Sequence, residues 1–239
     1  MPIIQALAEY KRVGNHAILA DVLLPRDSRP PVILHIHGGA LISGSRKYLL
    51  YWQAKRLLAA GFAIVSIDYR LAPETKLFNI LEDIQDAVAW VKGEGAGLFG
   101  YNPDRLGVMG GSAGGYLSLM CGTFTVKPRA IVSFYGYGDI LGDWYTRPSD
   151  FYCQRPPITK EEAHASIGKK TISVGGNKRY TFYFYCRQQG IWPQAVSGYS
   201  PVADREKLLQ ACPAYNIGPD YPPTMLLHGD QDTAVPFEQ

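Results

Sequence analysis

The chain has 239 residues, 46% hydrophobic and 19% charged, which is enough apolar material for one substantial core and gives no sign of disorder. Its net charge is only +3, without a long basic cluster or an apolar run of about 18 to 20 residues, which argues against nucleic-acid partners and a membrane span. The four cysteines lack the spacing of a zinc site or a disulfide framework, so we expect neither a metal nor another cofactor. One soluble domain over residues 1–239, in the cytoplasm, is expected; export and self-association into a homo-oligomer are left open.

Strand and helix patterns alternate along the first part of the chain. His16 to Leu24 carries alternating β-forming residues, and Pro31 to His37 is a short apolar run typical of a strand buried on both faces. Tyr51 to Ala60 has helical composition and stops at Gly61, and Phe62 to Ile67 follows as another apolar strand.

The same alternation continues further along the chain. Leu81 to Val91 has apolar residues at helical spacing, with Asp83 and Asp86 on the other side. Further strands are predicted at Leu106 to Met109, Ala130 to Phe134 and Pro223 to His228, and a further helix at Ala113 to Gly122. This order predicts an α/β fold with a mostly parallel central sheet and helices on both faces.

The segment from about residue 137 to residue 213 breaks this rhythm with prolines, glycines and many aromatic residues. We interpret it as an insertion that forms a cap over the strand ends, where open α/β sheets bind ligands. Some of its aromatic residues are predicted to line the acyl or alcohol pocket: Trp144, Tyr152, Phe184 and Trp192. For each of them, the alternative is that it holds the cap to the body.

A nucleophile motif lies between a predicted strand and a predicted helix. Residues 110–114 read Gly-Gly-Ser-Ala-Gly and match the G-x-S-x-G pattern. The pattern places Ser112 at the tip of a strained turn, and Gly110 and Gly114 let the strand and the helix approach closely. The helix that starts at Ala113 points the positive end of its dipole at the reacting centre. Ser112 is therefore the predicted nucleophile.

Two more motifs precede the serine in the chain: HGGA at residues 37–40 and DYRLAPE at residues 68–74. In order and spacing, the three motifs resemble the hormone-sensitive-lipase-like branch of the α/β-hydrolases, from about Pro31 to Pro236 and most weakly across the insertion. The resemblance implies an α/β-hydrolase fold. It also implies a serine carboxylesterase that cleaves short acyl or aryl esters through an acyl-enzyme intermediate, with a small-molecule ester as its partner.

The resemblance further implies an oxyanion hole built from the backbone N–H groups of Gly39, Ala40 and Ala113. Ala40 departs from the usual H-G-G-G loop, but alanine keeps the N–H donor if φ at this position is compatible. His35 and His37 lie upstream of the nucleophile, on or just after a predicted strand, and are expected to have structural roles.

The DYRLAPE motif at residues 68–74 is expected to be scaffolding beneath the oxyanion loop. Within it, Arg70 and Glu74 are interpreted as a buried ion pair. Neither residue is predicted to take part in catalysis.

Residues 228–236 resemble the acid loop H-G-x-x-D-x-x-V-P of the family, which implies that Asp232 is the triad acid. Asp230 falls on the variable position of that motif and is the weaker candidate. The triad order requires a histidine after the acid, and Thr233 to Gln239 contains none. We therefore expect the catalytic histidine, a last strand and a last helix to lie beyond Gln239.

Two other functions are compatible with this scaffold. One is a non-catalytic small-molecule-binding protein, because the family resemblance extends to plant hormone receptors that have lost the triad; the intact Ser112 and oxyanion loop argue against it. The other is a peptidase or amidase, which could use the same triad. Nothing in the chain suggests the second domain that a peptidase of this kind would have.

Overall fold

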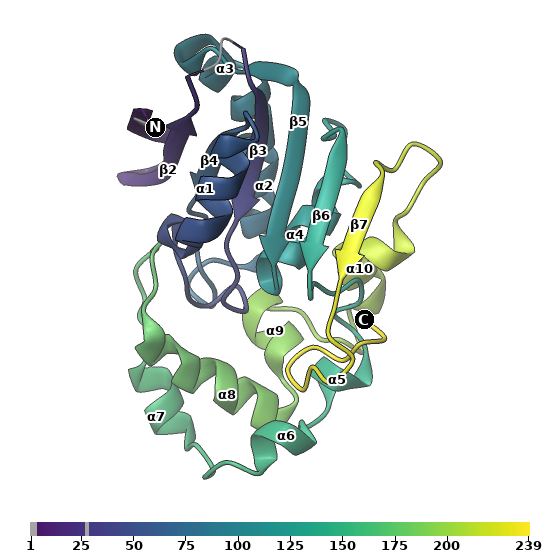
Figure 1. Cartoon of the computed structure of the whole chain (residues 1–239). Helices are drawn as coiled ribbons and strands as arrows, with labels where there is room; N and C mark the ends of the chain where they lie inside the picture. Colours follow the sequence, from purple (N-terminus) through teal and green to yellow (C-terminus); the bar gives the residue numbers. More distant parts are fainter. Residues whose placement is uncertain (1–3, 27–28) are drawn as a thin grey trace.

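Seven strands form one sheet in the computed structural model, which describes residues 4–26 and 29–239 (Figure 1). The strands are β1 (Ile4–Val13), β2 (His16–Leu24), β3 (Pro31–Ile36), β4 (Ala63–Ile67), β5 (Asn102–Gly111), β6 (Ala130–Phe134) and β7 (Thr224–Leu227). Their order is β1-β2-β4-β3-β5-β6-β7. The five strands β3, β4, β5, β6 and β7 run parallel to one another, whereas β2 is antiparallel to both β1 and β4. The mostly parallel sheet predicted from the sequence is confirmed, and its parallel strands end at one common edge.

Helices cover both faces of this sheet. They are α1 (Tyr51–Ala59), α2 (Leu77–Lys92), α3 (Glu94–Phe99), α4 (Ala113–Cys121), α5 (Asp143–Thr146), α6 (Asp150–Cys153), α7 (Lys160–Ala165), α8 (Tyr180–Gln189), α9 (Trp192–Ser197) and α10 (Arg205–Leu209), with short 3-10 turns η1 (Arg46–Tyr48), η2 (Asn177–Arg179) and η3 (Pro213–Tyr215). Leu58 of α1 clusters with Ile64 of β4, whereas Val65 belongs to the main core with α2 and α4. Because successive strand residues point to opposite faces, α1 lies on one face and α2 and α4 lie on the other.

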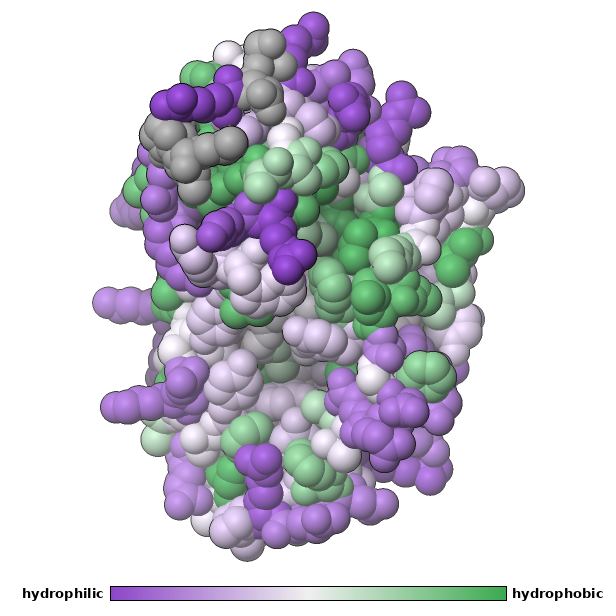
Figure 2. Space-filling model, viewed as in Figure 1, coloured by the Kyte–Doolittle hydropathy of each residue, from purple (hydrophilic) through white to green (hydrophobic). Residues whose placement is uncertain are grey.

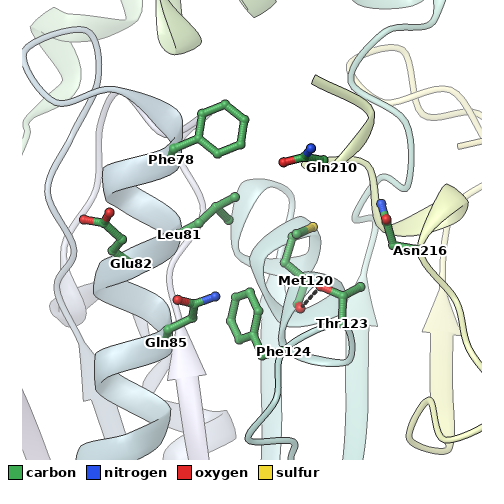
Figure 3. Close-up of a pocket in the computed structure, with 9 residues that line it drawn as sticks. All are labelled: Phe78, Leu81, Glu82, Gln85, Met120, Thr123, Phe124, Gln210 and Asn216. Carbon is green, nitrogen blue, oxygen red and sulfur yellow. Dashed lines mark hydrogen bonds between the residues drawn. The ribbon is translucent and has the colours of Figure 1, made fainter. Parts of the chain in front are cut away.

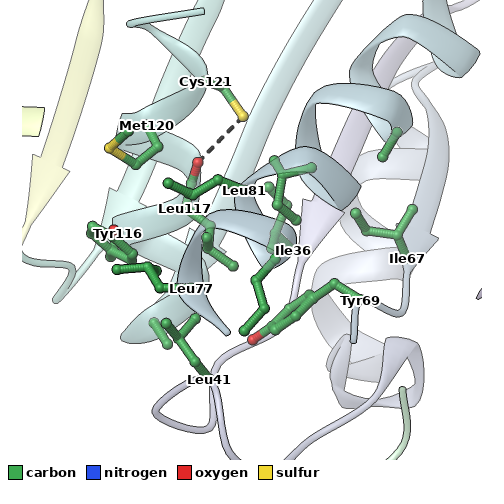
Figure 4. Close-up of a cluster of buried hydrophobic side chains, with 14 of the residues drawn as sticks. Ile36, Leu41, Ile67, Tyr69, Leu77, Leu81, Tyr116, Leu117, Met120 and Cys121 are labelled. Carbon is green, nitrogen blue, oxygen red and sulfur yellow. Dashed lines mark hydrogen bonds between the residues drawn. The ribbon is translucent and has the colours of Figure 1, made fainter. Parts of the chain in front are cut away.

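The main core lies between the sheet and helices α2 and α4 (Figure 4). Ile36 at the end of β3 and Ile67 at the end of β4 belong to this core, together with Leu77 of α2 and Leu117 of α4. All four side chains are fully buried, and such burial stabilises each by roughly 1.5–3 kcal/mol. The helix that follows Ser112 is therefore fixed firmly against the sheet.

Helix α2 differs from its prediction in two respects. It begins at Leu77 rather than at Leu81, because the apolar helical spacing extends back to that residue. The prediction that Asp83 lies opposite the apolar side is wrong, since its side chain is fully buried. Lys11 and Arg70 each approach a carboxylate oxygen of Asp83 at 2.7 Å, and this pairing compensates for the loss of hydration.

Residues 143–215 form a helical insertion between β6 and β7, made of α5 to α10 with η2 and η3. Figure 1 shows α5 to α9 gathered beyond the carboxyl ends of the parallel strands. Among the described residues, no helix combines the length and apolar character needed to cross a membrane. That the insertion acts as a cap over a bound substrate remains a prediction.

The sheet is tightly covered at its centre and open at β7. Every residue of β4 is buried, whereas every residue of β7 is exposed. Met225 and Leu226 are 58% and 69% exposed, and Figure 2 shows hydrophobic surface over the region of β6 and β7. β7 is also the last strand in the sheet order, so its outer edge carries no partner strand within the described chain.

Two glycines allow β3, β5 and α4 to meet without space for side chains. A Cβ atom on Gly114 would lie 2.1 Å from the carbonyl oxygen of Ile36, and one on Gly110 would lie 2.4 Å from the carbonyl carbon of Gly114. Both contacts are with backbone atoms, which cannot swing away as a flexible side chain can. The close approach predicted from the sequence is confirmed at both glycines.

Replacing Gly114 by alanine should therefore lower the free energy of unfolding by about 3 kcal/mol, because the added methyl group forces the backbones of β3 and α4 apart. Gly97 is the matched control: it is exposed in α3 and an added Cβ meets nothing within 4 Å. Gly97→Ala should raise stability by roughly 0.5–1 kcal/mol through helix propensity. Urea unfolding of both variants measures the contrast, and equal effects would show that the junction tolerates a methyl group.

Candidate active site

Ser112 occupies the turn between β5 and α4. Its backbone has φ 54° and ψ −123°, a conformation that residues with side chains rarely adopt. The Ser112 N–H donates to the carbonyl of Phe134, the last residue of β6, at 2.9 Å, which helps to hold the turn. Strain of this kind is characteristic of functional sites, where the surrounding structure enforces it.

The loop after β3 lies beside this turn. A Cβ atom on Gly38 would lie 2.7 Å from the Gly111 carbonyl oxygen and 3.4 Å from Ser112 Cβ. The three backbone N–H groups predicted to bind an oxyanion, those of Gly39, Ala40 and Ala113, donate no hydrogen bond to an acceptor in the described chain. Of the three residues, Gly39 lines the same cleft as Ser112, and the role of all three N–H groups in binding an oxyanion stays a prediction.

Ala40 lies in the left-handed region at φ 57°, where glycine is favoured. This conformation costs an alanine about 1 kcal/mol, but the fold does adopt it, so the substitution in the loop retains the N–H group. Trp192 from α9 donates its indole N–H to the Ala40 carbonyl oxygen at 3.1 Å. The helical insertion thus holds the strained residue from the other side.

Arg179 connects the helical insertion to the same loop and to the DYRLAPE segment. The guanidinium is buried and donates to the carbonyl oxygens of Ile42 and Ala72 at 2.5 and 2.7 Å. It also pairs with Glu74 at 2.6 Å, and the Glu74 side chain is only 1% exposed. A second link is the hydrogen bond from Ser43 Oγ to the Gly175 carbonyl oxygen at 2.9 Å.

The predicted pairing of Arg70 with Glu74 is therefore wrong. Arg70 turns toward α2 and pairs with Asp83, while Glu74 faces the helical insertion and pairs with Arg179. Arg70 and Glu74 therefore pair with residues of two different elements. The DYRLAPE segment is linked in this way both to α2 and to the helical insertion. Sequence spacing alone could not reveal this, because the two partners are distant in the chain.

His35 and His37 have structural surroundings. The His35 ring bonds to Ser66 Oγ at 2.8 Å, and the His37 ring stacks on Tyr69 with ring centroids 4.2 Å apart. Burial lowers the pKa of His35 to about 3 and that of His37 to about 4, so both rings are neutral at physiological pH. All five histidines of the chain lie in the described residues, and none is hydrogen-bonded to Ser112 Oγ.

Asp232 lies in the loop after β7, where its carboxylate is held in a defined position. Oδ1 accepts hydrogen bonds from the N–H groups of Ala234 and Val235 at 2.8 and 3.0 Å. Oδ2 lies 3.7 Å from His228 Nε2, and that nitrogen bonds to the Val235 carbonyl oxygen at 2.9 Å. Asp230, in contrast, is exposed and makes no side-chain hydrogen bond within the described chain.

A cleft of about 250 Å³ contains Ser112. It is lined by residues 37–39 of the HGGA loop, by the end of β5 and by three tyrosines, Tyr48, Tyr135 and Tyr180. The described residues that line this cleft do not include the four predicted pocket residues Trp144, Tyr152, Phe184 and Trp192. Their role in the acyl or alcohol pocket stays a prediction. Trp192 is fully buried and stacks on Tyr145, with ring centroids 4.1 Å apart. Tyr135 could have been expected here, because it directly follows a parallel strand at its carboxyl end.

A second cavity of about 470 Å³ lies between α2, α4 and the segment around η3 (Figure 3). Apolar side chains such as Phe78 and Met120 alternate there with amide groups, including those of Gln85 and Asn216. Its lining contains no predicted site residue and no strained nucleophile. Within the described residues, no group of three or more His, Cys, Asp or Glu side chains is arranged to hold a metal ion. The smaller cleft at Ser112 is therefore the candidate active site.

A mostly parallel sheet flanked by helices, with a strained serine between β5 and α4, defines an α/β-hydrolase fold. Residues 20–170 match the BD-FAE family model, which covers more than half of the chain. The chain belongs to the BD-FAE family.

Solved structures share the whole fold. A protein of unknown function from Staphylococcus aureus subsp. aureus Mu50 is 23% identical with a TM-score of 0.78, covering 98% of this chain and 82% of that one. An α/β hydrolase superfamily protein from Enterococcus faecalis is 22% identical with a TM-score of 0.74 and the same coverage. Esterase 2 of Thermogutta terrifontis, solved after phosphonylation by sarin, is 20% identical with a TM-score of 0.65, covering 98% and 75%.

Curated relatives include much longer fungal proteins. The non-reducing polyketide synthase ausA of Aspergillus calidoustus is 28% identical over 300 residues, covering 100% of this chain and 12% of the synthase. The non-reducing polyketide synthase Preu6 of Preussia isomera is 39% identical over 182 residues, covering 70% and 8%. The chain thus spans about a tenth of the length of these relatives.

The Glu74–Arg179 pair should make stability depend on pH. Burial by itself raises the pKa of Glu74, but the hydrogen bonds from Arg179 and from the Gly168 N–H outweigh it and hold the pKa below its usual value. The contribution is therefore complete above the pKa of an unfolded glutamate and is lost as the pH falls through the lowered value. Glu74→Gln should cost about 3 kcal/mol at pH 7, because it leaves Arg179 buried without a counter-charge.

Chemical denaturation from pH 7 to pH 3 measures this effect, and the deficit of Glu74→Gln should shrink toward the acid end. Glu238→Gln is the control, since Glu238 is exposed and makes no ion pair within the described residues. A deficit that stays constant down to pH 3 would contradict a lowered pKa of Glu74 in the folded state.

Proposed function

We propose that the chain is a serine hydrolase that cleaves carboxylic esters with short acyl or aryl groups through an acyl-enzyme intermediate. The observation that carries this proposal is the strained Ser112 turn, which lies in a cleft that Gly39 also lines, and the Gly39 N–H has no acceptor within the described chain. A hydroxyl beside such donors is the arrangement that acyl transfer needs.

In the proposed reaction, Ser112 Oγ attacks the ester carbonyl carbon. The carbonyl oxygen gains negative charge as the tetrahedral intermediate forms, and the N–H groups of Gly39, Ala40 and Ala113 stabilise it. The positive end of the α4 dipole acts in the same direction. The alcohol then leaves with a proton, and water hydrolyses the acyl-serine to release the acid.

Asp232 is the proposed orienting acid. The two N–H groups on Oδ1 fix its carboxylate, which leaves Oδ2 for an imidazole N–H. An imidazole between Asp232 and Ser112 would accept the hydroxyl proton during attack and return it to the leaving alcohol. None of the five histidines is bonded to Ser112 Oγ, so these residues hold a nucleophile and an acid without the base between them.

The matches to non-reducing polyketide synthases favour a second candidate, the cleavage of an acyl thioester. The same serine and N–H groups would serve, with a thiol as the leaving group. Turnover of an acyl thioester at least ten times faster than that of the corresponding oxygen ester would favour this candidate.

An aryl phosphonate should label Ser112 of this chain slowly, because no histidine of the described residues is hydrogen-bonded to its hydroxyl. Added imidazole should accelerate labelling about tenfold or more by supplying that base, and intact-mass and peptide analysis would report the rate and the residue. Ser112→Ala should abolish both labelling and rescue. Labelling at another residue, or none at all with imidazole present, would contradict the esterase proposal and favour a non-catalytic binding protein.

The two aspartates provide a matched pair for the acid. Asp232→Asn should remove most of the imidazole rescue, because the amide cannot accept the second imidazole proton. Asp230→Asn should leave the rescue near normal, since its side chain is exposed and unconstrained. The reverse result would show that Asp230, and not Asp232, is the acid.

A further inference from the structure

Arg187 of α8 is a buried cation without an acidic partner among the described residues. The residue is only 2% exposed, and no Asp or Glu in the described chain forms a salt bridge with it. Its guanidinium carbon lies 4.8 to 5.8 Å from the centres of four aromatic rings: Trp144, Tyr145, Tyr152 and Tyr183. Ring faces can stabilise such a charge, but a buried cation normally also has a carboxylate partner.

The hydrogen bonds of this guanidinium lead to the loop that carries Asp232. Nη1 donates to the Tyr183 hydroxyl at 2.8 Å and to the Ala234 carbonyl oxygen at 2.9 Å. Figure 1 shows this loop extending from β7 toward the helical insertion. One contact of Arg187 is thus with its own helix and the other with the proposed acid loop.

The Ala234 carbonyl and the Val235 N–H belong to the same peptide group. Arg187 binds the oxygen of that group, and its N–H donates to Asp232 Oδ1 at 3.0 Å. A cation on the oxygen polarises the peptide, which makes its N–H a stronger donor to the carboxylate. One peptide group therefore links the buried charge to Asp232.

We propose that Arg187 is a positioning residue for Asp232, acting through the Ala234–Val235 peptide group to hold the carboxylate toward the active site. The aromatic rings let the cation remain buried without a closer carboxylate that would compete for it. His228 is the other titratable group that faces Asp232, at 3.7 Å from Oδ2, and it lies on the opposite oxygen from the relay. The inference rests on Asp232 being the acid.

The test compares Arg187→Met, Arg187→Lys and Arg155→Met in the imidazole-rescued labelling reaction. Arg155 is the matched control, because it is exposed and lies over Tyr152 and two phenylalanine rings of the same aromatic group, with no hydrogen bond to the acid loop. Arg187→Met should lower the rescued rate about tenfold, Arg187→Lys should restore much of it, and Arg155→Met should change it less than about twofold.

A double-mutant cycle separates positioning from general stability. Arg187→Met should have almost no further effect on rescue in the Asp232→Asn background, because the carboxylate it positions is gone. An equal effect in both backgrounds would overturn the proposal and leave Arg187 as a purely structural residue.

The Val235 amide gives a readout that is independent of catalysis, and it applies even if Arg187→Met folds poorly. In Arg187→Lys, the amide proton resonance of Val235 should move upfield and its hydrogen exchange should become faster than in the parent chain, while Arg155→Met leaves both unchanged. An unchanged amide would overturn the relay. Loss of the rescue in every variant, including the parent, would instead show that the proposed function is wrong.

Discussion

The structure depends on a backbone contact that leaves no room for a side chain. At this contact, Gly114 of α4 lies directly against the carbonyl group of Ile36 at the end of β3. Because α4 begins this close to the sheet, the chain must reverse direction within one residue, and Ser112 takes the strained conformation that results. The same closeness puts the loop after β3 beside Ser112. A steric constraint in the core is thus the origin of the strained turn that places Ser112 in its cleft, beside the loop after β3.

Two arginines of the helical insertion stabilise loops that the sheet alone would leave unsupported. Arg179 satisfies carbonyl groups of the loop after β3, and Arg187 satisfies one in the loop after β7. Carbonyl oxygens in irregular backbone require such donors when they are buried, and a guanidinium can serve several at once. The insertion therefore supports both loops through buried charges, although it contributes no strand to the sheet.

The sequence predicted the central features because each has a local cause. Apolar runs identified β3 and β4, and the glycines around Ser112 identified the tight turn. The motif singled out Asp232 over Asp230, and in the fold Asp232 accepts two backbone hydrogen bonds whereas Asp230 is exposed. The catalytic role of Asp232 stays a prediction. β1 escaped prediction because its apolar residues do not mark one face of the strand: Leu7 is 61% exposed, whereas Lys11 is partly buried.

The sequence could not predict which residues that are far apart in the chain pair with one another in the fold. Arg70 and Glu74 are neighbours in the chain, but their partners are set by which elements the fold brings to each side. The three tyrosines of the Ser112 cleft come from three separate segments of the chain. Only Tyr180 lies in the aromatic-rich insertion between β6 and β7. Many of the aromatic residues in the insertion pack against one another, as Trp192 does on Tyr145, and the predicted pocket role of Trp144, Tyr152, Phe184 and Trp192 stays a prediction.

The gradient of burial across the sheet has a consequence for how the two proposed catalytic groups respond to thermal motion. Ser112 follows β5, which is paired on both sides near the most deeply buried strand, whereas Asp232 follows β7, whose residues are all exposed. Within the described chain, local opening is governed by buried contact, so the two groups are held by different means. Ser112 is fixed between paired, buried strands, whereas Asp232 is fixed by backbone hydrogen bonds and by the attachment of its loop to Arg187 of the helical insertion.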